Sequence, residues 1–129
     1  MAAPDLNAFA AMATRAVDGF PEPFRALAGQ VAVHVAEWPD AAMLADLGID
    51  NPLDLTGLYD GTPLTEQSAS DPSPYPDVVW LFRAPILDEL ATRPGLALQD
   101  LITHVVVHEF AHHFGWSDDD IAAIDQWWE

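Results

Sequence analysis

Residues 96–118 read LALQDLITHVVVHEFAHHFGWSD, and the part from 96 to 114 is the longest unbroken apolar pattern in the chain. On a helical wheel, its apolar side chains lie on every side of the helix, which is typical of a helix buried at the centre of a protein. The pattern therefore predicts a central helix, and its polar side chains need a reason to be there. The apolar members are Leu96, Leu98, Leu101, Ile102, Val105, Val106, Val107, Phe110, Ala111 and Phe114.

The predicted central helix contains the sequence His108-Glu109-Phe-Ala-His112, an H-E-x-x-H pattern. Two histidines four residues apart project from one face of a helix, so both imidazoles can bind one metal ion. Glu109 is offset around the helix by one residue, which places its carboxylate beside such an ion, where a base can take a proton from a metal-bound water. The pattern indicates His108 and His112 as metal ligands and Glu109 as the catalytic base.

Gly115 and Asp118 extend this pattern to H-E-x-x-H-x-x-G-x-x-D. A glycine can adopt a positive φ at the end of a helix, so the chain can turn back at Gly115 and offer Asp118 as the third ligand. Asp118 could instead cap the helix that follows, with Asp119 or a water molecule as the third ligand. Because Ser117 and Asp120 can form that cap without Asp118, we expect Asp118 to bind the metal.

A metal-free interpretation of the same histidines has to be weighed against the metal site. A single buried histidine is usually a core residue with a hydrogen-bond partner, but burying Glu109 without a counter-charge is costly. A metal ion between His108 and His112 supplies that charge, so we favour the metal. His104, one turn earlier, is expected either to line the cleft or only to pack, and His113 points about 100° away from His112, which favours a place outside the ligand set.

Aromatic residues offer further candidates around the site. Trp116, Trp127 and Trp128 could form the floor of the metal site, although packing in the core is the more common role of tryptophan. Tyr59 and Tyr75 could assist an oxyanion, but nothing in their spacing supports this role.

The rest of the chain predicts short helices and strands separated by Gly and Pro. The expected helices span residues 6–18, 40–47, 85–92 and 118–128, the expected strands 30–38, 57–61 and 77–83, and an exposed loop 62–76. Helices together with a small sheet indicate the α+β class, and the length of 129 residues favours one domain over residues 1–129.

The charge and composition of the chain exclude several classes of function. Asp and Glu number 21 against 4 for Lys and Arg, and the net charge is -17, so we expect no binding to nucleic acid or to anionic membranes. With no cysteine, any metal must be held by His and carboxylate groups. No signal peptide or 18-residue apolar run is found. We therefore expect a cytoplasmic protein, which could form a homodimer.

The extended pattern resembles that of the minimal zincins, a bacterial family of small zincin-like metallopeptidase domains. In that family the helix reads H-E-x-x-H-H-F-G, followed by a serine and acidic residues. Residues 108–120 here read HEFAHHFGWSDDD. The likeness extends to residues 57–61 and 78–83, so it covers the chain after the first helix, and it is most specific in the C-terminal third.

This resemblance implies a mixed fold with a small sheet packed on the active-site helix. It also implies zinc bound by the residues that match His108, His112 and Asp118, with Glu109 as the base. The larger metzincins support their site with a methionine turn downstream of the ligands, whereas the last methionine here is Met43. Another residue must therefore support the site, and the C-terminal tryptophans are the candidates.

Two functions follow from these residues. The first is a zinc-dependent peptidase with one zinc ion, three protein ligands and a water, acting on peptide or protein substrates. An extended substrate would be held by main-chain hydrogen bonds to a strand edge, expected at residues 78–83. The alternative is a non-catalytic binding or regulatory module, in which a metal ion holds two helices together or no metal is bound. The small size of the chain motivates this alternative, because it leaves few residues to form a cleft.

Overall fold

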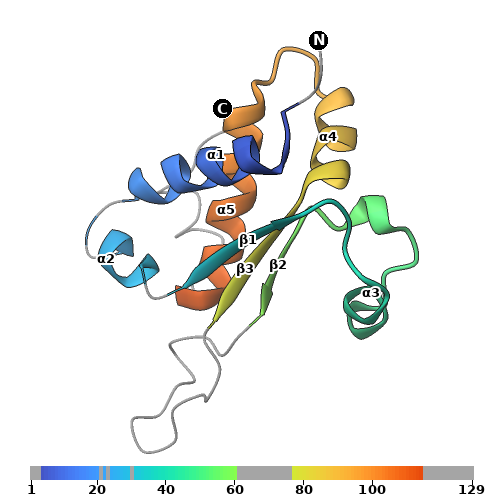
Figure 1. Cartoon of the computed structure of the whole chain (residues 1–129), viewed down its shortest axis with the longest axis horizontal. Helices are drawn as coiled ribbons and strands as arrows, with labels where there is room; N and C mark the ends of the chain where they lie inside the picture. The colour runs from blue at the N-terminus through green and yellow to red at the C-terminus, as the bar shows by residue number, and fades with distance from the viewer. Residues whose placement is uncertain (1–3, 21, 23, 30, 61–76, 115–129) are drawn as a thin grey trace, which may run out of the picture.

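A computed structural model of the chain describes residues 4–20, 22, 24–29, 31–60 and 77–114, and for residues 24, 27 and 112–114 it describes the backbone alone. The loop predicted over 62–76 and the helix predicted over 118–128 lie outside the described residues. The helices and the small sheet confirm the predicted α+β fold. The elements are α1 (Leu6–Asp18), α2 (Phe24–Ala28), β1 (Ala32–Ala36), α3 (Ala41–Leu47), the 3-10 helix η1 (Pro52–Asp54), β2 (Gly57–Asp60), β3 (Val78–Phe82), α4 (Arg83–Ala91) and α5 (Leu98–Phe114) (Figure 1).

The described strands form a mixed sheet in the order β1-β3-β2. β1 pairs with β3 in parallel, and β2 pairs with β3 antiparallel, with Gly57 opposite Leu81. β3 is therefore the central strand, and the prediction that residues 78–83 form the edge of the sheet is wrong. Val79, Leu81 and Phe82 are all fully buried, as expected for a strand with a neighbour on each side. In the described part of the chain, β1 and β2 are the edges.

Helix α5 packs on β2 and β3, while α1 packs on β1 and along α5 (Figure 1). Ile102, Val106 and Phe110 of α5 are fully buried, together with Phe9 of α1. The ring of Phe20, just after α1, meets the ring of Phe110 edge to face with 5.3 Å between their centroids. The prediction of a central, buried helix is therefore confirmed for α5. None of the described helices is both long enough and apolar enough to cross a bilayer.

Capping residues, glycine and proline determine where the helices begin and end. The Asp40 carboxylate accepts the backbone N–H of Met43 at 2.8 Å, and Gly48 ends α3 with a φ of 67°, so this helix begins and ends as predicted. Helix α4 begins at Arg83, earlier than the predicted start at Pro85. Proline is tolerated throughout the first turn, because N–H groups there have no helical partner.

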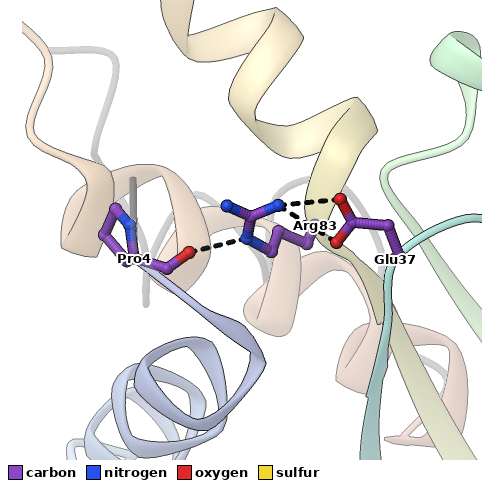
Figure 2. A network of polar contacts seen from close by, with 3 residues as sticks. All are labelled: Pro4, Glu37 and Arg83. Atoms are coloured by element: carbon purple, nitrogen blue, oxygen red, sulfur yellow. Dashed lines mark hydrogen bonds and ion pairs between the residues drawn. The ribbon is translucent and has the colours of Figure 1, made fainter. Parts of the chain in front are cut away.

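Arg83 joins three parts of the chain at the point where β3 passes into α4 (Figure 2). Its Nε donates to the carbonyl oxygen of Pro4 at 2.6 Å, and its Nη1 donates to the two carboxylate oxygens of Glu37 at 2.7 and 3.1 Å. Charge-assisted contacts of this kind are stronger than neutral hydrogen bonds. These contacts hold the start of α4, a helix whose C-terminal part lines the cavity described below.

Candidate metal centre

A cavity of about 180 Å³ lies beside α5 and is also lined by the residue before β2 and by the end of α4 with the turn that follows it. His108 and Glu109, which the sequence indicates as a metal ligand and a base, both line it. His104 also lines it, which confirms one of its two expected roles. The lining residues are Thr56, Glu89, Arg93, His104, Val105, His108 and Glu109.

One ring nitrogen of His108 has no hydrogen-bond partner among the residues that the structure describes. This atom, Nε2, is buried, and no described residue forms a hydrogen bond with it. The ring of His108 lies against that of His104, with 4.1 Å between the centroids and 58° between the planes. A buried polar atom without a partner is rare, and an imidazole nitrogen kept in this state is suited to bind a metal ion. The position of His108 therefore fits a zinc ligand.

Glu109 lies next to this imidazole in a poorly solvated position. Burial raises the pKa of the Glu109 carboxyl group from its ordinary value of 4.5 to about 7, and a hydrogen bond from the backbone of Tyr59 opposes part of this rise. A carboxyl group with a pKa near 7 can both accept and return a proton at neutral pH. Glu109 therefore has the properties of a general base.

Gly57 allows β2 to approach α5 at this point. A Cβ atom at position 57 would lie 2.7 Å from the Cγ1 of Val105, which is too close, and 3.1 Å from the Cγ of Glu109, which is tight enough to push that side chain aside. The strand reaches the helix only because residue 57 has no side chain, and this contact brings the backbone of Tyr59 within hydrogen-bonding reach of Glu109.

The side chain of Tyr59 points to a different partner. Its hydroxyl group donates to the Oδ2 of Asp77 at 2.7 Å, and Asp77 is a buried charged residue at the start of β3. The contribution of Tyr59 to the site is therefore its backbone N–H, and the structure gives no support to an oxyanion role for its hydroxyl. Tyr75 lies outside the described residues.

The remaining predicted site residues are only partly described. His112 and His113 lie on α5, but only their backbone is described, and Asp118, Asp119 and the three C-terminal tryptophans lie outside the described residues. Within the described ranges, no three His, Cys, Asp or Glu residues are grouped so as to hold a metal ion. This is expected, since two of the three predicted ligand side chains fall beyond those ranges.

Sequence reasoning missed the part of the cavity that comes from other segments. Thr56, Glu89 and Arg93 are separated along the chain from the H-E-x-x-H pattern, and only the packing of α4 and β2 against α5 brings them there. The one local signal was the turn at Arg93-Pro-Gly95, which indicates a defined backbone but no function. Gly57 belongs to the segment that carries the family resemblance.

An H-E-x-x-H pattern on one helix is typical of zinc sites of metallopeptidases. Here its first histidine has a buried nitrogen with no hydrogen bond from the described residues, and burial raises the pKa of its glutamate to about 7. The model of the family described as zincin-like metallopeptidase matches residues 28–128. The chain belongs to this family, which generally depends on zinc. No curated protein matches the chain in sequence. The matched range contains all of the described strands, α5 and the complete extended pattern through Asp118.

Proposed function

We propose that the chain is a zinc-dependent peptidase in which His108, His112 and Asp118 bind one zinc ion and Glu109 is the general base. The observation that carries this proposal is the pairing of His108 with Glu109 in one cavity. One residue offers a buried nitrogen that receives no hydrogen bond from the described part of the chain, and the next offers a carboxyl group with a pKa of about 7.

Zinc, when bound, supplies a positive charge that polarises a carbonyl group and lowers the pKa of a water molecule. Glu109 accepts a proton from the water that attacks the peptide carbonyl, and it returns this proton to the nitrogen of the leaving amine. The backbone N–H of Tyr59 holds the carboxyl group in place during both transfers. The low polarity around Glu109 keeps its proton affinity high enough for the first transfer.

The test combines metal content with turnover in four variants. We expect Glu109→Gln to keep stoichiometric zinc and to lose peptide hydrolysis, because the amide cannot accept the proton. We expect His112→Ala and Asp118→Ala to lose zinc. The matched control is His34→Ala, which removes an exposed histidine of β1. Full activity of Glu109→Gln would refute the mechanism, and tight zinc without hydrolysis of any peptide would favour the non-catalytic module.

A further inference from the structure

A second cavity, of about 250 Å³, lies between the end of α1 and α5. Three of its lining residues, Gln99, Thr103 and Val107, follow one another at intervals of four and therefore share one face of α5. None of the residues that line it also lines the cavity of His108 and Glu109. Pockets for drug-sized ligands measure about 300 to 1,000 Å³, so this cavity has the size for a smaller organic molecule.

Arg15 brings a positive charge to this second cavity. It stands in the last turn of α1, and its side chain is exposed. Each of the other arginines, Arg25, Arg83 and Arg93, lies beside a glutamate. The guanidinium of Arg15 forms no ion pair or hydrogen bond with any residue that the structure describes. Because a guanidinium binds a carboxylate through two parallel hydrogen bonds, Arg15 is available to an acidic group of a ligand.

Gln99 brings an amide whose oxygen has no partner. Its Nε2 donates to the backbone carbonyl of Met12 at 2.9 Å and to the Oγ1 of Thr103 at 3.2 Å. The carbonyl of Met12 can only accept, which fixes the orientation of the amide. The Oε1 of Gln99 is buried, and within the described ranges no group donates to it. A buried acceptor in this state is costly, and an N–H donor of a bound molecule would remove the cost.

Apolar side chains and one hydroxyl group complete the wall. Ala16, Phe20 and Val107 are buried and line the cavity. The ring of Phe20 is held in place by its edge-to-face contact with Phe110. The Oγ1 of Thr103 accepts from Gln99, so the hydrogen of this hydroxyl can be donated to a ligand. The cavity therefore combines a cation, an unpaired acceptor and an apolar surface.

We propose that this cavity binds a small α-amino acid with an apolar side chain. Arg15 binds its carboxylate, the Oε1 of Gln99 accepts from its ammonium group, and its side chain lies against Phe20 and Val107. The net charge of -17 disfavours a simple anion, whereas an amino acid offers a carboxylate without net charge. This inference is independent of the proposed function, because the two cavities share no lining residue.

The first experiment titrates the full chain by calorimetry with three probes of similar size. L-leucine has both charged groups, L-leucinamide lacks the carboxylate, and 4-methylpentanoate lacks the ammonium group. We expect saturable binding of L-leucine below about 10 mM, at least about 10-fold tighter than that of either analogue, because each analogue loses a charged hydrogen bond. General attraction to the acidic chain predicts the opposite order, with the cationic L-leucinamide bound best. That order, or no binding of L-leucine, would overturn the proposal.

The second experiment repeats the titration with variants of two exposed arginines. Arg15→Gln should weaken the binding of L-leucine by about 10-fold or more and remove its advantage over L-leucinamide. The matched control, Arg25→Gln, changes an arginine that does not line the cavity and should bind L-leucine as the parent does. If Arg15 only stabilises the end of α1 through the helix dipole, Arg15→Gln lowers the melting temperature and leaves both affinities unchanged, which would refute the proposed site.

NMR spectra recorded during the titration locate the bound L-leucine. We expect the largest shifts of backbone amide signals at the end of α1 and at Gln99 and Thr103. Shifts centred on Thr56 and Glu89, which line the other cavity, would place L-leucine at the candidate metal centre and refute the second site. Neither experiment measures hydrolysis. Binding of L-leucine here therefore stands even if the protein cleaves no peptide, and its absence leaves the proposed peptidase function untouched.

Discussion

Gly57 of β2 lies so close to Glu109 of α5 that a Cβ atom at position 57 would stand 3.1 Å from the Cγ of Glu109. This close approach connects the position of the sheet to the position of the proposed base. The same Cβ atom would lie 2.7 Å from the Cγ1 of Val105 and 3.2 Å from the carbonyl oxygen of Trp80. Any side chain at residue 57 therefore has to displace the strand, the helix or the glutamate.

We expect Gly57→Ala to lower the free energy of unfolding by about 1 to 3 kcal/mol, the usual cost of overpacking, and to reduce hydrolysis through displacement of Glu109. Urea denaturation and kcat measure the two effects. Gly19→Ala makes the same change at a position where the nearest atom, the carbonyl of Ala16, lies at an ordinary 3.5 Å, and it should change neither. Equal stability of both variants would show that β2 can move without cost.

The raised pKa of Glu109 predicts a pH dependence of the metal-free protein. Below its ordinary pKa of 4.5 the group is protonated in both states and costs nothing. Between pH 4.5 and about 7 the unfolded state has lost this proton while the folded state still binds it, so stability falls as the pH rises across this window. Glu109→Gln removes the effect and should gain up to about 3 kcal/mol relative to the parent between pH 4.5 and 8.

Denaturation of both proteins with a chelator present, at several pH values, gives the difference in stability. The comparison with Glu109→Gln is necessary because other carboxylates also titrate in this range. A difference that stays constant with pH would mean that Glu109 is solvated in the folded protein.

Tyr59→Phe distinguishes the backbone of Tyr59 from its hydroxyl group. Because Tyr59 meets Glu109 through its backbone N–H, the variant should keep kcat within about 2-fold of the parent. It should lower the free energy of unfolding by about 1 to 2 kcal/mol, because the buried Asp77 loses the hydrogen bond of the hydroxyl. A loss of kcat by about 100-fold without loss of stability would assign a catalytic role to the hydroxyl.

Arg83→Gln should lower the free energy of unfolding by about 1 to 2 kcal/mol, because the partly buried guanidinium bonds both Pro4 and Glu37. Arg25→Gln breaks an exposed pair with Glu22 and should change stability by less than about 0.5 kcal/mol. Thermal unfolding of both variants checks this order. A cost for Arg83→Gln as small as that for Arg25→Gln would show that the three segments hold together without the arginine.

The parts of the fold that follow from local signals could be predicted from the sequence. Helix α1 has the predicted bounds, and the cap at Asp40 with the glycine at 48 determines α3. Helix α2, with five residues, was missed because it is too short to show a periodic pattern. The central position of β3 could not be predicted, since the order of strands depends on contacts between distant segments.

The candidate site also has a part that the sequence predicts and a part that only the folded structure reveals. His104, His108 and Glu109 share one helix, so their spacing already predicts a common location. Arg93 and Thr56 reach the same cavity through tertiary packing, which no spacing within α5 can reveal. The pKa of Glu109 is also a property of the folded protein, because it depends on burial, to which the approach of β2 contributes.

The hydrogen bond between the Tyr59 backbone and Glu109 has a second consequence, which concerns self-association. In the described part of the chain β2 is an edge strand, and free N–H groups at such an edge can pair with a strand of another molecule. The N–H of Tyr59 is occupied by a carboxyl group from α5 instead. The residue proposed as the base therefore also occupies one hydrogen-bonding position of this edge, which makes the middle of the edge a poorer template for intermolecular β-sheet.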